Sequence, residues 1–278
     1  MKFIVSAHTL LKHLQLIYGV VGTNASLPVL EDFLMQITKD GRLTAAATDL
    51  ETSLKISIPV EANQAGEICI PAKVLMEILK NLPDQPLTFH IHPDSGVVEM
   101  ISDNGRYKIV GEKAENFPRE PKPESVEQTF SLSGETLLTA IQKGIFAIST
   151  NDMRPAMTGM LFELDAEGAT FVATDSHRLV KYVKKGLVLE HASGAKGISF
   201  IVPKKPLNLL KGLLGEDAVL QASLSKSHLF LQTDDMEIAC RLIDARFPDY
   251  KVVIPVDSPY HLVIPRADLQ QALRRISV

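Results

Sequence analysis

The chain has 278 residues, of which 45% are hydrophobic and 22% charged, and a formal net charge of −4. This composition is typical of a globular protein with at least two domains. No apolar run is long enough for a membrane span, and the N-terminus lacks the features of a secretory signal peptide. The only two cysteines, Cys69 and Cys240, lie far apart in the sequence, which argues against a disulfide framework and favours a reducing, cytoplasmic location. The acidic net charge alone argues against nucleic-acid binding.

The first 125 residues predict one pattern used twice: a strand, a helix and three further strands. In the first half, a strand over 2–6 precedes a helix over 7–20, where apolar residues recur at helical spacing. Strands are expected over 28–38, 42–48 and 52–60. In the second half, a strand over 67–71 and a helix over 73–82 precede strands over 87–92, 97–101 and 106–110. The charged, proline-containing segment 113–128 is expected to be an exposed linker.

The chain also repeats itself with a long period. Residues 6–11 recur as 133–138, 47–49 as 173–175, 70–73 as 202–205, and 117–118 as 247–248. The matches keep their order, which predicts two copies of one domain over 1–125 and 126–257. A third copy is expected to start at 258 and to be incomplete at Val278. One helix cannot bury a core alone, so we expect a longer polypeptide.

The predicted helices carry most of the positive charge. Over residues 7–20, 72–82, 134–148, 203–214 and 266–276 they hold ten basic and three acidic side chains, a net +7, against −11 elsewhere. If all helices lie on one side, that side suits sequence-independent binding to phosphates. The alternative is that these cations are only solvated helix faces. The candidate DNA contacts from this argument are Lys12, Lys73, Lys143, Lys204, Lys205, Lys211, Arg274 and Arg275.

Five motifs, in order along the whole chain, resemble the bacterial sliding clamp family, the beta subunit of DNA polymerase III. They are MKF at 1–3, LPVL at 27–30, ATDLE at 47–51, ATDSHRL at 173–179 and RFPDY at 246–250. The resemblance implies an α+β fold of repeated β-α-β-β-β halves, with the helices on one face of curved antiparallel sheets. It implies three domains per subunit and two subunits closed head to tail around duplex DNA. It implies no catalysis, cofactor or metal.

The resemblance further implies partners and site residues. The partners are the replicative polymerase, the clamp loader, repair polymerases and other proteins that carry a clamp-binding peptide, with a core like Gln-Leu-x-Leu-Phe. DNA contacts fall on Lys12, Asn24, Asn151, Arg154, Lys204 and Lys205. The peptide-binding pocket falls on Met157, Thr174, Ser176, His177, Arg178, Leu179, Pro248, Val252 and Val253. The subunit interface falls on Arg106, Tyr107, Lys108, Ile109 and Val278.

This sequence departs from the pattern of a better-known relative at a few of these positions. Asn24 stands in place of an arginine, and Pro155 and Ala156 stand in place of two aromatic residues. Weaker DNA contact is expected there. Ser176 replaces a glycine, which is a small change.

The alternative function is a two-domain repeat enzyme with an interdomain cleft. Asp175, Ser176 and His177 could suggest a hydrolase triad, but neighbours on one strand point to opposite faces. His90 and His92 share a strand face without an obvious third metal ligand. We therefore favour the non-catalytic clamp.

Overall fold

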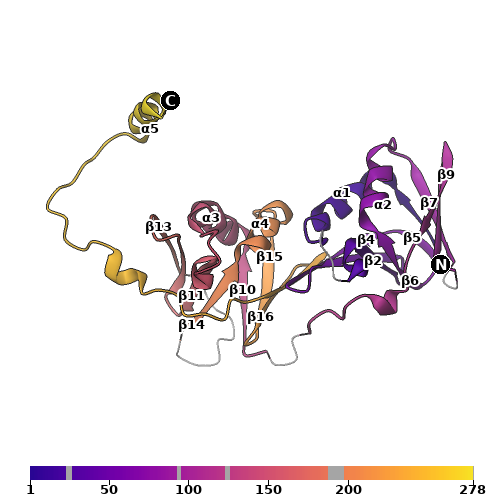
Figure 1. The fold of residues 1–278 in the computed structure, drawn as a ribbon, viewed down its shortest axis with the longest axis horizontal. Coiled ribbons are helices and arrows are strands. Elements are labelled where there is room, and N and C mark those ends of the chain that lie inside the picture. Colours follow the sequence, from indigo (N-terminus) through magenta and orange to yellow (C-terminus); the bar gives the residue numbers. More distant parts are fainter. Residues whose placement is uncertain (23–26, 93–94, 123–125, 187–196, 278) are drawn as a thin grey trace. The chain divides into compact units, whose positions relative to one another are not determined.

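The computed structural model describes residues 1–22, 27–92, 95–122, 126–186 and 197–277 (Figure 1). The chain forms two compact units, Met1–Arg246 and Phe247–Val278, and each is considered by itself. Within the described residues, no helix is long and apolar enough to cross a membrane.

The first unit contains the β-α-β-β-β pattern four times. The first repeat comprises β1 (Lys2–Ser6), α1 (Ala7–Tyr18), β2 (Asp32–Ile37), β3 (Arg42–Thr48) and β4 (Thr52–Pro59), then the short β5 (Glu61–Gln64), then β6 (Gly66–Pro71), α2 (Ala72–Lys80), β7 (Pro86–His92), β8 (Val97–Ser102) and β9 (Gly105–Val110). The second comprises β10 (Gln128–Ser133), α3 (Gly134–Gly144), β11 (Gly159–Asp165), β12 (Gly168–Thr174) and β13 (Leu179–Lys185), then β14 (Ile198–Pro203), α4 (Lys204–Leu213), β15 (Val219–Leu224), β16 (His228–Gln232) and β17 (Met236–Arg241). The predicted fold class is confirmed.

The largest differences from the predicted bounds are at the start of one strand and at the end of one helix. The strand expected over 28–38 begins only at Asp32, because Pro28–Glu31 form a 3-10 turn. Pro28 has no N–H to donate to a sheet and suits the first position of such a turn. The helix expected over 134–148 ends at Gly144, and Ile145–Ala147 continue as a 3-10 turn.

Strand pairing joins the two repeats. All three sheets are antiparallel, and the largest has the order β10-β15-β16-β17-β4-β3-β2-β6. In its middle, β17 of the second repeat pairs with β4 of the first, from Met236 opposite Ile56 to Cys240 opposite Thr52. The other two sheets, β5-β1-β7-β8-β9 and β13-β12-β11-β14, belong to one repeat each. The backbone hydrogen bonds of the sheet therefore run unbroken across the boundary.

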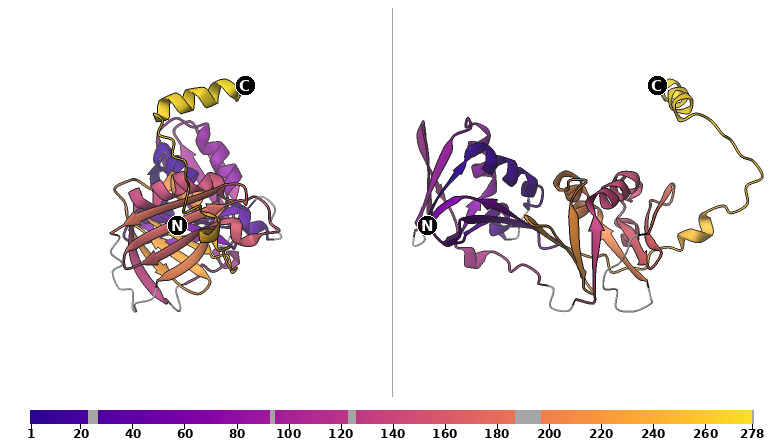
Figure 2. Two further views of the ribbon diagram at one scale, coloured as in Figure 1. Left: turned by 90° about the vertical axis from the view of Figure 1, so that its left-hand side faces the viewer. Right: turned by 180° about the vertical axis from the view of Figure 1, so that it is seen from behind.

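Helices α1 to α4 lie on one side of the sheets of the first unit, as the opposite views of Figures 1 and 2 show. Helix α1 buries Leu10, Leu14 and Ile17, and the equivalent faces of the other three helices join the same hydrophobic core. The repeats also share their capping: the hydroxyl of Ser6 accepts a hydrogen bond from the Thr9 amide, and that of Ser133 from the Thr136 amide.

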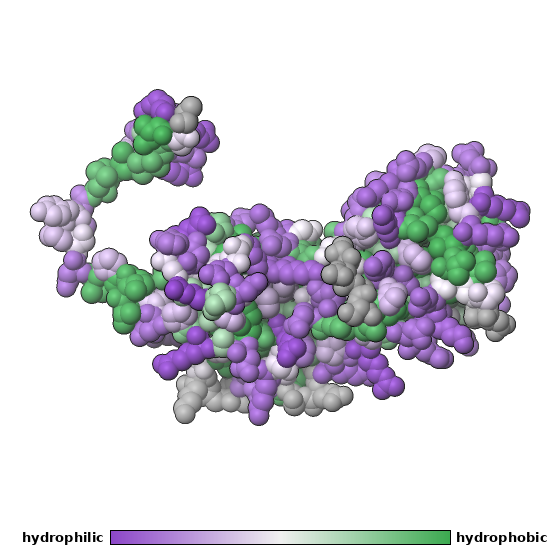
Figure 3. Space-filling view, in the orientation of Figure 1, coloured by the Kyte–Doolittle hydropathy of each residue, from purple (hydrophilic) through white to green (hydrophobic). Residues whose placement is uncertain are grey.

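The second unit contains a 3-10 turn, Tyr250–Val253, and the helix α5 (Arg266–Ile276). None of the side chains of α5 is buried. Hydrophobic residues gather on this helix and on the segment after Phe247 (Figure 3). The amphipathic pattern of α5 comes from Leu269, Leu273 and Ile276, all of which are exposed.

Candidate nucleic-acid interface and partner site

The lysines of the helix layer point away from the core. Lys12 on α1, Lys73 on α2, Lys143 on α3 and Lys211 on α4 are exposed, on faces that the buried leucines and isoleucines do not use. The ammonium of Lys143 lies 4.9 Å from the centroid of the Tyr182 ring, a cation–π contact that leaves the charge available to an anion. The four lysines belong to all four helices on one side of the sheets, an arrangement that suits binding to a polyanion.

Two further lysines begin α4, and their surroundings differ. Lys204 is half-buried, and no ion pair of this residue is seen among the described residues. Lys205 is exposed, but its ammonium lies 2.5 Å from a carboxylate oxygen of Asp49 in the first repeat. The sequence comparison predicted the same role for both lysines, whereas the structure gives only Lys205 an acidic partner.

The segment that holds Asn151 and Arg154 is exposed and is tied down at both ends. The Asn151 amide donates to the hydroxyl of Ser149 at 3.0 Å, and its side-chain oxygen accepts from the Met153 amide at 3.0 Å. The guanidinium of Arg154 donates to the hydroxyl of Ser176 at 2.5 Å. A predicted DNA contact therefore touches a residue predicted for the peptide pocket.

The predicted pocket residues of the first unit form a tight turn after β12. The Thr174 hydroxyl donates to the Arg178 carbonyl at 2.8 Å and accepts from the Ser176 amide at 3.2 Å. One carboxylate oxygen of Asp175 accepts from the amides of His177 and Arg178, at 3.0 and 2.9 Å. These two amides, and the guanidinium of Arg178, hold the pKa of Asp175 well below its ordinary value. Hydrogen bonds among its own groups therefore hold the turn and orient its polar side chains.

Ser176 adopts a left-handed backbone conformation, with a φ of 77°. Glycine is the residue that takes this conformation at least cost, so serine at this position is not the small change that the sequence suggested, because it places a side chain on strained backbone. Met157 lies beside the turn and accepts from the Ser176 hydroxyl, with its sulfur 3.4 Å from that oxygen. Leu179 is half-buried, and the guanidinium of Arg178 lies over the ring of Phe146, 5.6 Å from its centroid.

The first repeat contains the same turn, which the sequence motif did not reveal. The Thr48 hydroxyl donates to the Thr52 carbonyl and accepts from the Leu50 amide. An oxygen of Asp49 accepts from two backbone amides, and Leu50 has a φ of 75°. The Ala-Thr-Asp motif that both repeats contain predicted a sequence repeat. The hydrogen bonds that these residues form in the turn are seen only in the structure.

The predicted interface strand β9 is the last strand of its sheet and pairs only with β8. Along it, Tyr107 is half-buried and Ile109 buried, while Arg106 and Lys108 are exposed. Val110 is 73% exposed. Just beyond β9, Glu112 forms a bridge with Cys69 of β6. Along β9 itself, no second strand pairs with it among the described residues, so the backbone groups on its outer side are open to pairing with another strand.

The remaining predicted residues belong to the second unit or fall outside the description. Pro248, Val252 and Val253 are exposed in the second unit, as are Arg274 and Arg275 near the end of α5. Asn24 and Val278 lie outside the described residues.

Three features of the described residues bear on the enzyme alternative. No group of three or more His, Cys, Asp or Glu side chains that could hold a metal occurs among them. Burial raises the pKa of Cys69 and of Cys240 to about 12, so both thiols stay protonated at neutral pH. The carboxylate of Asp175 accepts from backbone amides and Arg178, which is not the arrangement of a hydrolase triad.

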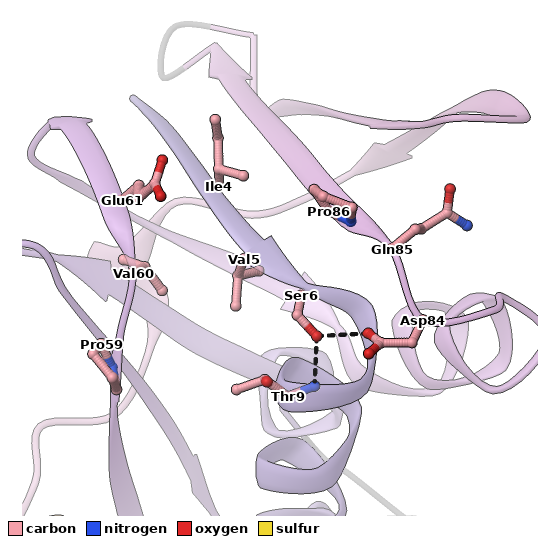
Figure 4. A pocket seen from close by; sticks show the side chains of 10 residues that line it. All are labelled: Ile4, Val5, Ser6, Thr9, Pro59, Val60, Glu61, Asp84, Gln85 and Pro86. Carbon is pink, nitrogen blue, oxygen red and sulfur yellow. Dashed lines mark hydrogen bonds between the residues drawn. The ribbon is translucent and has the colours of Figure 1, made fainter.

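An open hollow lies at the start of α1, between β1 and the segment that joins β4 to β5 (Figure 4). Its polar side chains bind one another: Ser6 donates to a carboxylate oxygen of Asp84 at 2.7 Å and accepts from the Thr9 amide. This hydrogen bond and another from the His8 amide lower the pKa of Asp84. The hollow lies within one repeat, and its polar groups serve to cap the helix.

Comparison with known proteins gives a consistent result. The family model for the N-terminal domain of the DNA polymerase III beta subunit matches residues 1–121, and the model for its central domain matches 131–249. The beta sliding clamp of Vibrio cholerae is 31% identical over 283 residues, covering 100% of this chain and 74% of that protein.

Solved structures agree with the sequence relatives. A sliding clamp from Pseudomonas aeruginosa, bound to griselimycin, has a TM-score of 0.91 and 29% identity, covering 99% of this chain and 73% of that chain. The Helicobacter pylori beta clamp, bound to a DNA ligase peptide, shares the fold with a TM-score of 0.91 at 19% identity, covering 100% of this chain and 76% of that chain. The chain belongs to the DNA polymerase III beta subunit family, the DNA sliding clamps, which are non-catalytic processivity factors.

Proposed function

We propose that this protein encircles duplex DNA as a ring of two subunits and tethers the replicative polymerase to it. The observation that carries the proposal is the set of exposed lysines on α1 to α4, on one side of the sheets. Long cationic side chains bind phosphates without reading bases, as a protein that slides must do. Tethering raises the effective concentration of the polymerase at the primer end.

We also propose that the chain divides into domains at residues 1–125, 126–257 and 258 onward.

The test of encirclement uses the topology of DNA. The protein is loaded onto nicked circular duplex by a clamp loader, and the circle is then cut once with a restriction enzyme. A ring stays on the circle and leaves the linear product by sliding off its ends. Equal retention on circular and linear DNA would contradict encirclement and favour ordinary groove or backbone binding.

We propose that the Asp175 turn is one wall of a site for clamp-binding peptides from polymerases, the clamp loader and repair proteins. It offers the apolar side chain of Leu179 beside a fixed set of polar groups, the combination that peptide sites use. The Helicobacter pylori clamp of the same fold, which is bound to a DNA ligase peptide, supports this proposal.

Leu179→Asp is predicted to abolish binding of a synthetic peptide with a Gln-Leu-x-Leu-Phe core. The substitution places a charge against the apolar part of the peptide, and the desolvation of that charge opposes binding. Fluorescence anisotropy of the labelled peptide measures the effect. Val183→Asp is the matched control, because Val183 is 45% exposed on the same strand, β13, and away from the turn. Unchanged affinity of the Leu179 variant would show that the pocket lies elsewhere.

A further inference from the structure

The boundary between the two repeats holds an ion pair in the helix layer. Lys205, the second residue of α4, places its Nζ 2.5 Å from Oδ2 of Asp49 in the first repeat. The same Nζ lies 3.5 Å from the carbonyl oxygen of Val20, just beyond the carboxyl end of α1. Lys205 thus meets a carboxylate and the negative end of a helix dipole, and both belong to the other repeat.

Close apolar packing lies beside this ion pair. Gly19 ends α1, and a Cβ atom built on it would lie 2.9 Å from Cδ2 of Leu209. Leu209 is four residues after Lys205, so both project from the same face of α4. Val20 is fully buried. The end of α1 and the start of α4 therefore form a second joint between the repeats, in addition to the pairing of β4 with β17.

The turn around Asp49 holds its carboxylate ready for a cation. Oδ1 accepts from the amides of Glu51 and Thr52, at 3.1 and 2.7 Å, which leaves Oδ2 free for Lys205. In the equivalent turn of the second repeat, Oδ1 of Asp175 also accepts from two amides, and Oδ2 accepts from Arg178 at 2.8 Å. In the first repeat alone, the cation comes from the neighbouring repeat.

Exposed ion pairs usually contribute little to stability, but this one is partly shielded. The side chain of Asp49 is 20% exposed and that of Lys205 is 44% exposed. Two acceptors hold the ammonium, whereas neighbouring Lys204 has no ion pair among the described residues. A phosphate would have to compete with both acceptors for Lys205, so Lys204 is the better phosphate ligand of the two.

We propose that Lys205 is a positioning residue that clasps the two repeats through Asp49, and that it does not bind a DNA phosphate. The pairing of β4 with β17 joins the repeats along one line. The clasp lies in the helix layer, away from that line, and acts with the contact of Gly19 and Leu209 to oppose rotation about it. It thereby sets the lysines of α1 and α2 in line with those of α3 and α4. This inference rests on the proposed DNA binding.

The test compares Lys204→Gln with Lys205→Gln by measuring the affinity of the protein for duplex DNA over a range of salt concentrations. A lysine that contacts a phosphate contributes about 0.9 to the slope of log affinity against log salt concentration. Lys204→Gln is expected to lower the slope by about that amount. Lys205→Gln is expected to leave the slope unchanged and to weaken binding about threefold to tenfold at every salt concentration, since only the alignment is lost.

The clasp itself is measured by the distance between spin labels in the two repeats. Cysteines for labelling replace Val74 on α2 and Val219 on β15, which are 45% and 60% exposed, whereas native Cys69 and Cys240 are buried. Both Lys205→Gln and Asp49→Asn are expected to broaden the distance distribution. Lys205→Arg, which keeps a cation within reach of Oδ2 and leaves the Asp49 turn intact, is expected to keep the narrow distribution of the parent, which a general sensitivity of this position to substitution could not produce.

Two results would overturn the proposal: a slope lowered by about 0.9 in Lys205→Gln, or unchanged distances in both Lys205→Gln and Asp49→Asn. If Lys204→Gln leaves the slope unchanged while Lys205→Gln and Asp49→Asn still broaden the distances, the result counts against DNA binding and leaves the clasp in place.

Discussion

Leu50 and Ser176 occupy equivalent positions in the two repeats, and both have left-handed backbone conformations, with φ of 75° and 77°. Such a conformation costs a residue other than glycine roughly 1–2 kcal/mol. The cost persists because the turn satisfies its own backbone: in each repeat, the threonine hydroxyl and the aspartate carboxylate accept from the following amides. The strain belongs to a turn that presents one carboxylate oxygen outward.

Leu50→Gly is predicted to stabilise the protein by up to about 1 kcal/mol. Glycine removes the left-handed cost of roughly 1–2 kcal/mol but loses about 0.5–1 kcal/mol through the greater freedom of the unfolded chain. Leu50 is 55% exposed, so little packing is lost. Urea unfolding measures the change, and Leu50→Ala, which keeps the strain, should give no gain. A gain in the alanine variant as large as in the glycine variant would argue against backbone strain.

Asp32, at the start of β2, is predicted to destabilise the protein at neutral pH. Burial, together with the smaller effects of the Glu112 and Glu31 carboxylates, raises its pKa to about 6. Between its ordinary pKa and about 6, the folded chain binds more protons than the unfolded chain, so stability falls as the pH rises through this window.

Asp32→Asn is therefore expected to stabilise the protein at about pH 8 by at most about 3 kcal/mol, at about 1.4 kcal/mol per pKa unit. It should change the stability little below about pH 3, where the carboxyl of Asp32 is protonated in both the folded and the unfolded chain. Urea unfolding at the two pH values tests this. Glu112→Gln should give a smaller gain, because burial is the larger cause. A loss of stability in Asp32→Asn at the higher pH would show that the carboxylate has a stabilising partner.

The sequence alone identified some residues of the candidate sites and missed others. The Ala-Thr-Asp motif and the lysines of the helices could be identified, because a short motif and helical periodicity are both visible in the local sequence. The sequence could not identify Asp49 as the partner of Lys205, since 156 residues separate them. That pair depends on how the end of α1 packs against α4, which is decided by tertiary contacts and not by local sequence.

At the scale of elements, periodicity predicted the two β-α-β-β-β units of the first repeat, and the sequence repeat extended the pattern to the second. Alternation over 87–92 and helical spacing over 7–20 are strong signals because each element has one buried face. Two features were missed. Pro28 and its 3-10 turn replaced the start of a strand, and the short strand β5, Glu61–Gln64, was not predicted. Both depend on turn geometry over three or four residues, which a hydrophobic pattern does not encode.

The edge strand β9 is predicted to mediate the contact between subunits. Val110→Lys is expected to raise the dimer dissociation constant by at least about tenfold, because a lysine on an exposed edge opposes pairing with another strand. Val110 is 73% exposed, so the fold should be unaffected. Sedimentation over a range of concentrations measures the constant. Val74→Lys on α2, also an exposed valine, is the control. Equal weakening by both variants would indicate a general effect of charge and not a strand interface.

At the scale of the whole first unit, the two repeats have the same order of elements and also contribute strands to one sheet. The core cluster is continuous and contains residues of both repeats, such as Phe3 and Leu14 of the first and Phe162 and Leu207 of the second. The sequence predicted two domains from the repeat, but it did not predict that β4 and β17 would pair. Pairing between strands that are distant in the chain depends on their exposed edges and cannot be read from either strand alone.

This continuity predicts that the two repeats unfold as one cooperative unit. Leu54 on β4 is fully buried and lies opposite Ile238 of β17, at the boundary between the repeats. Leu54→Ala should lower the free energy of unfolding by about 2–5 kcal/mol, because it leaves a cavity in a close-packed core. Hydrogen exchange should then become faster in the most protected amides of both β7 and β11, although β11 belongs to the other repeat. Val219→Ala on the exposed face of β15 should change the exchange of neither strand. Faster exchange confined to the first repeat would show instead that the two repeats are independent cooperative units joined only by a paired edge.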